Sequence, residues 1–190
     1  PKNIASFSLV DRNLVQSLFQ CTHQKCQEVF IGTYTHSGSG NCSLVKVSPI
    51  MPKKETFSEI ISDLSSGFVE IYNQALSAES KNLLQLVGIG IRKALEFLVK
   101  DFAVNQHPEK EEEIRKLFIG KCIDEYIQDA NVKACAKRAA WLGNDETHYT
   151  RKWEDKDIND LKLLTKLTVN WIENVILTEK YINEMDEKKT

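Results

Sequence analysis

The chain has 190 residues, of which 42% are hydrophobic, so it is long enough for one or two domains with a sizeable core. Its 25 basic and 27 acidic residues give a formal net charge of −2, which excludes a general electrostatic attraction to nucleic acid or anionic lipid. No apolar run reaches the length of a membrane span, and the first residues lack the layout of a signal peptide, so we expect no membrane contact. The five cysteines, an odd number, favour a reducing compartment, and we expect the cytoplasm.

Residues 1–52 differ in composition from the rest and predict a small antiparallel β domain. They hold three of the eight glycines, three of the four prolines and three of the five cysteines. Runs of β-branched and aromatic residues between turn signals predict strands at 18–21, 28–35 and 43–47. The sequence Ser-Gly-Ser-Gly-Asn at 37–41 predicts a hairpin turn between the last two strands.

This first segment also carries a candidate metal site. Cys21 and Cys26 resemble one knuckle of a zinc ribbon, and Cys42 with either His23 or His36 would complete four ligands. Zinc prefers such nitrogen and sulfur donors in a tetrahedron. The alternative is that the thiols pack as small hydrophobic groups, or that the ribbon has lost its metal. A structural zinc ion is therefore the one cofactor that the sequence suggests.

Residues 53–190 predict a second domain built from helices, beginning after Pro49 and Pro52. Apolar residues recur at helical spacing in seven segments. These segments are 56–64, 68–76, 81–102, a helix opened by Pro108, 122–127, 132–142 and 158–181. We expect the first two to be one helix broken near 65–67, and we expect a mainly α fold overall.

The segment 81–102 is the most apolar helix, and its hydrophobic residues cover more than one stripe, so we expect it at the centre of the bundle. Gly88 and Gly90 are costly inside a helix and predict close helix contact or a local bend. Arg92, Glu96 and Lys100 are spaced four apart and share one face. This polar row is either a salt-bridge stripe or the wall of a binding cleft.

The stretch 139–149 is the best candidate for chemistry. Gly143 suits the position just past a helix end, and Asn144 and Asp145 are good N-cap residues. We therefore predict that one helix ends here and another begins, with His148 one turn along and on the same face as Asn144. The helix N-terminus would favour a neutral His148 imidazole, acting either as a general base or as a hydrogen-bonded structural post.

Basic residues cluster around this stretch. Between 133 and 152 there are five of them against two acids, Asp145 and Glu146. The five are Lys133, Lys137, Arg138, Arg151 and Lys152.

Two stretches resemble a known family. Residues 90–101 (Gly-Ile-Arg-Lys-Ala-Leu-Glu-Phe-Leu-Val-Lys-Asp) and 141–149 (Trp-Leu-Gly-Asn-Asp-Glu-Thr-His-Tyr) resemble the bacterial family catalogued as domain of unknown function 4145. That family is similar to the HEPN superfamily (higher eukaryotes and prokaryotes nucleotide-binding). The resemblance covers roughly residues 55–180, and the segment before it is similar to the degenerate zinc-ribbon leader of such proteins.

The resemblance implies a fold and a set of partners. It implies an HEPN-like helical bundle, a homodimer, and RNA or a nucleotide as ligand. Many superfamily members are metal-independent ribonucleases of phage defence, toxin–antitoxin pairs or RNA processing, which implies a defence-related context.

The superfamily's catalytic motif is an arginine, four to six further residues and a histidine. His148 matches the histidine, and Asn144 matches the Gly-Asn of the family. The positions expected for the arginine, 141–143, hold Trp-Leu-Gly; Arg138 lies about one turn earlier and Arg151 follows the histidine. The motif is therefore displaced in this chain.

Two interpretations follow for the function. In the first, His148 is the base for attack by a ribose 2′-hydroxyl, Asn144 and Asp145 position it, and Arg138 supplies the cation for the phosphorane charge. In the second, Asn144 and His148 lock a corner of a non-catalytic module that binds nucleic acid, a nucleotide or a partner protein. Candidate binding residues in either case are Arg92, Glu96 and Arg151.

The placement of four side chains distinguishes the two interpretations. They are Arg92, Glu96, Arg138 and His148. Convergence on one open cleft favours the ribonuclease, whereas a buried closed network favours the binding module.

Overall fold

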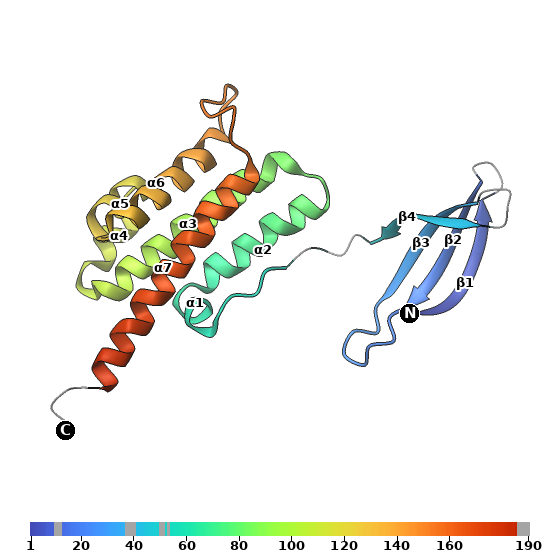
Figure 1. Cartoon of the computed structure of the whole chain (residues 1–190), viewed down its shortest axis with the longest axis horizontal. Coiled ribbons are helices and arrows are strands. Elements are labelled where there is room, and N and C mark those ends of the chain that lie inside the picture. The colour runs from blue at the N-terminus through green and yellow to red at the C-terminus, as the bar shows by residue number, and fades with distance from the viewer. Residues whose placement is uncertain (10–12, 37–40, 50–51, 53, 186–190) are drawn as a thin grey trace. The chain divides into compact units, whose positions relative to one another are not determined.

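The chain folds into two compact units, Pro1–Met51 and Pro52–Thr190. A computed structural model describes residues 1–9, 13–36, 41–49, 52 and 54–185 (Figure 1). The sequence predicts the boundary after residue 52, one residue later. The fold is mainly α with a small antiparallel sheet at the start of the chain, which confirms the predicted mainly α class.

The first unit is a four-stranded antiparallel meander in the order β1-β2-β3-β4. Its strands are β1 (Lys2–Leu9), β2 (Leu14–Gln20), β3 (Val29–His36) and β4 (Cys42–Ser48). Strand β1 and most of β2 are not predicted from the sequence. The predicted hairpin turn at 37–41 lies, apart from Asn41, outside the described residues.

One face of the sheet carries an aromatic cluster. The rings of Phe19 and Phe30 stack with centroids 5.4 Å apart, and Tyr34 lies edge-on to Phe19 at 6.4 Å. Phe19 and Phe30 are cross-strand partners, which is the pairing that most stabilises a sheet. Gly32 lies between Phe30 and Tyr34 along β3. A β-carbon there would fall 2.8 Å from the Tyr34 ring, so the glycine leaves room for this side chain.

The described part of the second unit contains seven α-helices and one 3-10 turn. They are α1 (Glu59–Leu64), α2 (Ser66–Ser80), α3 (Leu84–Gln106), η1 (Pro108–Lys110), α4 (Glu111–Lys116), α5 (Ile119–Tyr126), α6 (Ala130–Asp145) and α7 (Ile158–Glu184). The predicted break between the first two helices is confirmed. Ser65 separates them, and its hydroxyl accepts the Phe68 N–H at the start of α2.

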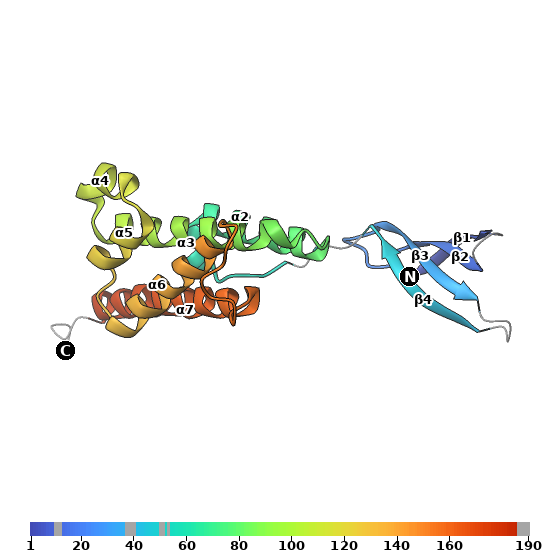
Figure 2. The ribbon, with the colours of Figure 1, turned by 90° about the horizontal axis from the view of Figure 1, so that it is seen from above.

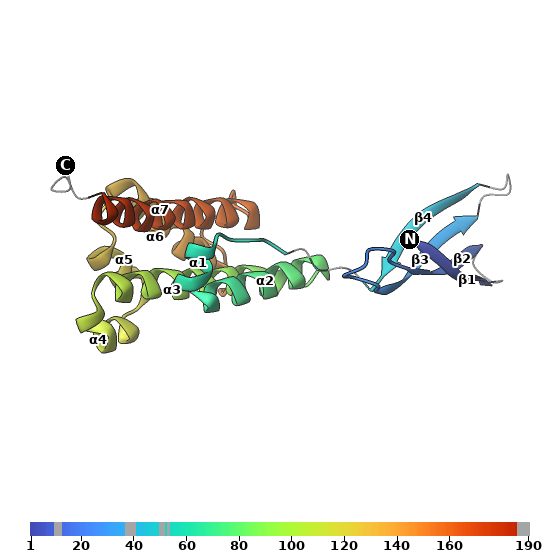
Figure 3. The ribbon, with the colours of Figure 1, turned by 90° about the horizontal axis from the view of Figure 1, so that it is seen from below.

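Helix α3 is the centre of this unit, as its apolar composition predicts. It contacts α2, α5, α6 and α7 and buries nine residues, including Ile91, Leu95 and Leu98. Views from above and from below show α2 and α3 in one layer and α6 with α7 in the next (Figures 2 and 3). Side chains from both layers form one hydrophobic core.

The two glycines of α3 allow close helix contact, which confirms one of the two alternatives predicted for them. A β-carbon at Gly90 would lie 2.8 Å from Cβ of Ala75 on α2. At Gly88 it would overlap Cγ of Glu146, which follows the end of α6. The two residues therefore bring α3 close to neighbours on two sides.

Among the described helices, none combines the length and the apolar character needed to cross a membrane.

Candidate functional site

The corner between α6 and α7 differs from the predicted one. Helix α6 runs through Gly143 and Asn144 and ends at Asp145, and residues 146–157 are turn and loop. No helix begins at Asn144, so the prediction that His148 lies one turn into a new helix is wrong. The side chain of Arg92 on α3 occupies the space where a β-carbon of residue 143 would stand, so the glycine lets α3 and α6 approach closely here.

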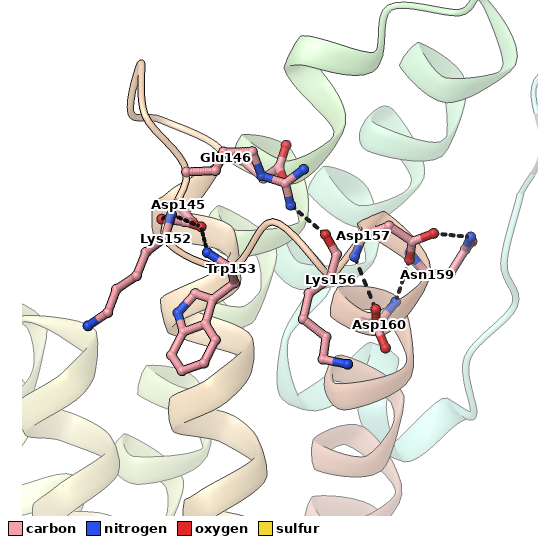
Figure 4. Close-up of polar contacts among 9 residues, drawn as sticks. Asp145, Glu146, Lys152, Trp153, Lys156, Asp157, Asn159 and Asp160 are labelled. Carbon is pink, nitrogen blue, oxygen red and sulfur yellow. Dashed lines mark hydrogen bonds and ion pairs between the residues drawn. The ribbon is translucent and has the colours of Figure 1, made fainter.

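Asp145 is the anchor of this corner. Its carboxylate accepts hydrogen bonds from the backbone N–H of Lys152, at 2.8 and 2.9 Å, and of Trp153, at 2.8 Å (Figure 4). The residue is 7% exposed. These bonds from Lys152 and Trp153 lower the pKa of Asp145 below its ordinary value, although burial acts in the opposite direction. Asp145 therefore holds the loop and is unsuited to accept a proton.

A second brace joins the two sides of the loop. The Arg151 guanidinium lies 3.0 Å from Oε1 of Glu146 and donates a 2.6 Å hydrogen bond to the carbonyl of Lys156. The Glu146 side chain packs against Gly88 of α3 and occupies the place that a β-carbon at position 88 would take. Arg151, predicted as a binding residue, therefore has a structural role in closing the loop.

The loop ends in a capping box that starts α7. The Asp157 carboxylate accepts the backbone N–H groups of Asn159 and Asp160, and the Asp160 carboxylate accepts the N–H of Asp157 (Figure 4). Hydrogen bonds from Asp160 and Asn159 lower the pKa of Asp157. This capping box sets the start of α7 at Ile158.

His148 lies exposed in the turn that follows α6. Its Nε2 is 3.1 Å from Nδ2 of Asn144, so the predicted pairing of these two residues is present. Its backbone N–H donates to the Asp145 carbonyl at 3.2 Å. The predicted influence of a helix N-terminus on the imidazole does not apply, because this turn belongs to the end of a helix.

The other candidate cations, Arg92 and Arg138, make their described polar contacts with groups other than His148. The Arg92 guanidinium lies 3.7 Å from Glu96, which also binds Lys100 at 2.8 Å, and the three form the predicted salt-bridge row along α3. Arg138 is exposed and donates to the carbonyl of Ala134, one turn back on α6. The geometry is therefore neither a single open cleft nor a buried closed network.

Two tryptophans dominate the surface beside the corner. Trp141 on α6 is 50% exposed, and Trp153 in the loop is 37% exposed. Both line a hollow of about 130 Å³ together with two cations and two leucines. These four are Arg138, Lys156, Leu142 and Leu164. A second hollow of about 220 Å³ is lined by the same two tryptophans and by Asn144, Asp145 and Lys152.

The tryptophans and cations that line these hollows are not predicted as a site from the sequence, although the spacing of two of them gives a signal. Arg138 and Trp141 are three apart, so a cation and an indole share a face of the helix. Trp153 and Lys156 come from the loop, and their place beside that face depends on the fold. The side chains of Lys152, Trp153 and Lys156 all extend to the same side of the loop (Figure 4). In this arrangement aromatic faces and cations can bind a flat anionic ligand.

The candidate zinc ligands are divided between the two ends of a strand. Gln20, next to Cys21, pairs with Val29 at the start of β3, and Cys42 pairs with His36 at its end. Val29 and His36 are seven residue steps apart along β3, about 23 Å at roughly 3.3 Å per step. Cys21 and Cys26 therefore cannot share one ion with Cys42 and His36.

The strand register therefore contradicts the prediction that Cys21, Cys26, Cys42 and His36 bind one zinc ion. The side chain of His36 lies outside the described part of the chain. Among the described residues, no three His, Cys, Asp or Glu side chains gather as a metal site. Cys21, His23 and Cys26 remain together in the β2–β3 loop, which is closed by hydrogen bonds from Cys21 N–H to Glu28 and from Cys26 N–H to His23.

Comparison with family models, with curated proteins and with solved structures finds no match to this chain. The resemblance to the family of unknown function 4145 and to HEPN proteins stays a prediction based on residues 90–101 and 141–149.

Proposed function

We propose that the helical unit is a non-catalytic, HEPN-like module that binds a nucleotide or nucleic acid at the α6–α7 corner. The observation that carries this proposal is the half-exposed pair of indoles, Trp141 and Trp153, with Arg138, Lys152 and Lys156 around it. Exposed aromatic rings stack on bases, and cations beside them attract phosphate. A local group of cations can attract phosphate although the chain as a whole is not basic, with a net charge of −2.

The polar contacts around the corner support binding rather than catalysis. The Asp145 carboxylate is fully engaged by two backbone N–H groups, and Arg92 is packed against Gly143 and paired with Glu96. A general base needs a free lone pair near the proton that it removes. Asp145 and Arg92 are therefore committed to the fold, whereas Arg138 stays exposed.

Intrinsic fluorescence tests the proposal. Trp171, the third tryptophan, lies against Phe102 with ring centroids 5.4 Å apart, away from the corner, and serves as an internal reference. We expect saturable quenching by nucleotides or nucleic acid in the wild type and in Trp171→Phe, but not in Trp153→Ala. Binding that persists in Trp153→Ala, or no binding of any nucleotide or nucleic acid, would reject the proposal, and the second result would shift attention to a partner protein.

A metal-independent ribonuclease that uses His148 is the alternative function. The observation in its favour is the exposed imidazole of His148 held 3.1 Å from the Asn144 amide. A cleavage assay on structured RNA with EDTA, comparing wild type with His148→Ala, decides the matter. Cleavage that disappears in the variant would establish the ribonuclease, and no cleavage by the wild type would leave the binding module.

We further propose that the chain acts as a homodimer in a defence-related context. The resemblance to HEPN proteins supports both parts of this proposal. An exposed apolar patch at the start of α3, formed by Leu83, Leu84, Leu86 and Ile89, gives the dimer a physical basis, because contiguous apolar surface marks interaction sites.

A further inference from the structure

We propose that the two hollows beside Trp141 and Trp153 bind two consecutive unpaired bases of a single-stranded nucleic acid. This inference rests on the proposed binding function and specifies its ligand. The observation behind it is that both hollows share the same two aromatic lining residues. Trp141 and Trp153 line both of them, so the pair of indoles stands between one hollow and the next.

The smaller hollow has the chemistry of a base pocket with a phosphate at its rim. Leu142 and Leu164 give it apolar surface, and the indoles give it flat faces. Arg138 and Lys156 are its charged residues, and no carboxylate is among the described residues that line it. A neutral planar ring fits this floor, and the two cations suit the phosphate attached to it.

The larger hollow is more polar and suits hydrogen bonding to the edge of a base. Asn144 contributes an amide with both donor and acceptor atoms. The Asp145 carboxylate also lines this hollow, but its oxygens accept the Lys152 and Trp153 N–H groups, which offsets its charge. Lys152 Nζ lies 5.7 Å from the Trp153 ring centroid, beside the shared wall.

The arrangement favours single strands over duplexes. A base inside a duplex stacks on its neighbours, so its faces are hidden from a protein indole, whereas an unpaired base exposes both faces. Cations stand on each side of the indole wall: Arg138 and Lys156 on one side and Lys152 on the other. A strand whose successive bases occupy the two hollows would therefore pass its phosphates along these three cations.

The number of cations sets the expected salt dependence. Neutralising three phosphates of a single strand predicts that log K falls with log salt concentration at a slope of about −2. Stacking of one base on an aromatic residue contributes about 1–3 kcal/mol. Removing either indole should therefore weaken binding by about 5- to 150-fold.

Fluorescence anisotropy with labelled oligouridine and oligothymidine, set against a hairpin duplex of the same sugar, tests the inference. We expect the single strands to bind at least about tenfold more tightly than the duplexes, since stacking on the indoles requires exposed bases. The RNA and DNA arms show whether the sugar contributes. Trp141→Ala, Trp153→Ala and Lys156→Glu should each weaken single-strand binding, and Lys156 is an exposed loop residue whose change leaves the fold intact.

Two control variants match the test variants. Trp171→Phe changes a tryptophan outside the corner, and Lys121→Ala removes an exposed cation on α5. Both should bind as the wild type does. Duplex binding as tight as single-strand binding, or single-strand binding unchanged in both Trp153→Ala and Lys156→Glu, would overturn the inference. Duplex or mononucleotide binding that Trp153→Ala abolishes would still uphold the broader proposal, whereas no binding by any ligand would end both.

Discussion

Gly143 lies directly against the side chain of Arg92, and a β-carbon at position 143 would overlap Arg92 Cβ and fall 2.9 Å from its Cγ. The contact joins α6 to α3 at the last turn before the loop. Arg92 Cα is only 3.3 Å from the same point, so the arginine cannot simply swing away. We expect Gly143→Ala to destabilise the protein by about 1–3 kcal/mol through overpacking, measured by urea unfolding.

Gly120 provides the matched control for that substitution. It lies in the first turn of α5, where no atom stands within 4 Å of the place that a β-carbon would take. Alanine is better than glycine in a helix, so Gly120→Ala should be neutral or stabilise by up to about 1 kcal/mol. Equal effects of the two substitutions would show that the contact between Gly143 and Arg92 is not tight.

The contacts of Asp145 predict how stability changes with pH. Its pKa is lowered in the folded protein from the ordinary value of 3.8, so the unfolded chain binds a proton more readily. The stabilisation is therefore present above pH 3.8 and is lost as the pH falls through the lower folded pKa. Asp157, whose pKa is also lowered, adds a second contribution of the same sign.

Asp145→Asn should separate these contributions. Asparagine offers one acceptor oxygen where the carboxylate offers two, and its amide would face the Lys152 and Trp153 N–H groups. We expect a lower melting temperature at neutral pH and a weaker loss of stability in acid than the wild type shows. Asp155→Asn, at an exposed loop carboxyl that lies 3.5 Å from Lys156, should change neither property. A wild-type pH profile in Asp145→Asn would contradict this role.

The sequence predicts helices well where their periodicity is strong. The helix predicted at 81–102 is α3 at Leu84–Gln106, because buried residues recur through its whole length. Strand β1, Lys2–Leu9, was missed because its alternation is weak: small and polar residues such as Ser6 take the positions where apolar ones would give the signal. Cross-strand pairing with β2 supplies what the local sequence lacks.

The corner shows what local patterns cannot predict. Gly143 followed by Asn144 has the residue types of a helix end, yet α6 continues through both, and the glycine instead leaves room for Arg92 of α3, distant in sequence. Asp145 looks like an N-cap and does bind backbone N–H groups, but those of residues seven and eight further on. The patch of Trp141 and Trp153 depends on the same fold of the loop. Residue spacing therefore identifies the residues of the corner, but the contacts that these residues make depend on segments distant in sequence.

His148 should contribute little to stability. It is exposed, and its side-chain contact is the 3.1 Å approach to Asn144. Exposed substitutions usually change stability by less than about 0.5 kcal/mol, so His148→Ala should unfold at nearly the same urea concentration as the wild type. A histidine that locks the corner would instead lower the melting temperature substantially when it is replaced. A large fall would show that His148 holds the corner more firmly than this contact indicates.

The register of β3 predicts that Cys42 cannot bind a metal ion held at the β2–β3 loop. Cys42 pairs with His36, at the far end of the strand from Cys21 and Cys26. Zinc binds ligands at about 2.0–2.3 Å, so Cys42 cannot reach an ion held at that loop. Elemental analysis of protein purified without chelators should give the same zinc content, whatever it is, for wild type and Cys42→Ser. Zinc that disappears in Cys42→Ser would contradict the strand register.

The exposed patch at the start of α3 predicts the effect of charge on oligomeric state. Leu83, Leu84, Leu86 and Ile89 are each between 42% and 55% exposed, and three of them share one face at a spacing of three. We expect light scattering to find a dimer that Leu86→Glu with Ile89→Lys converts to monomer, because buried charges without partners oppose association. Phe118→Lys, at a side chain 85% exposed at the start of α5, is the control and should remain dimeric. A dimer that survives the double substitution would place the interface elsewhere.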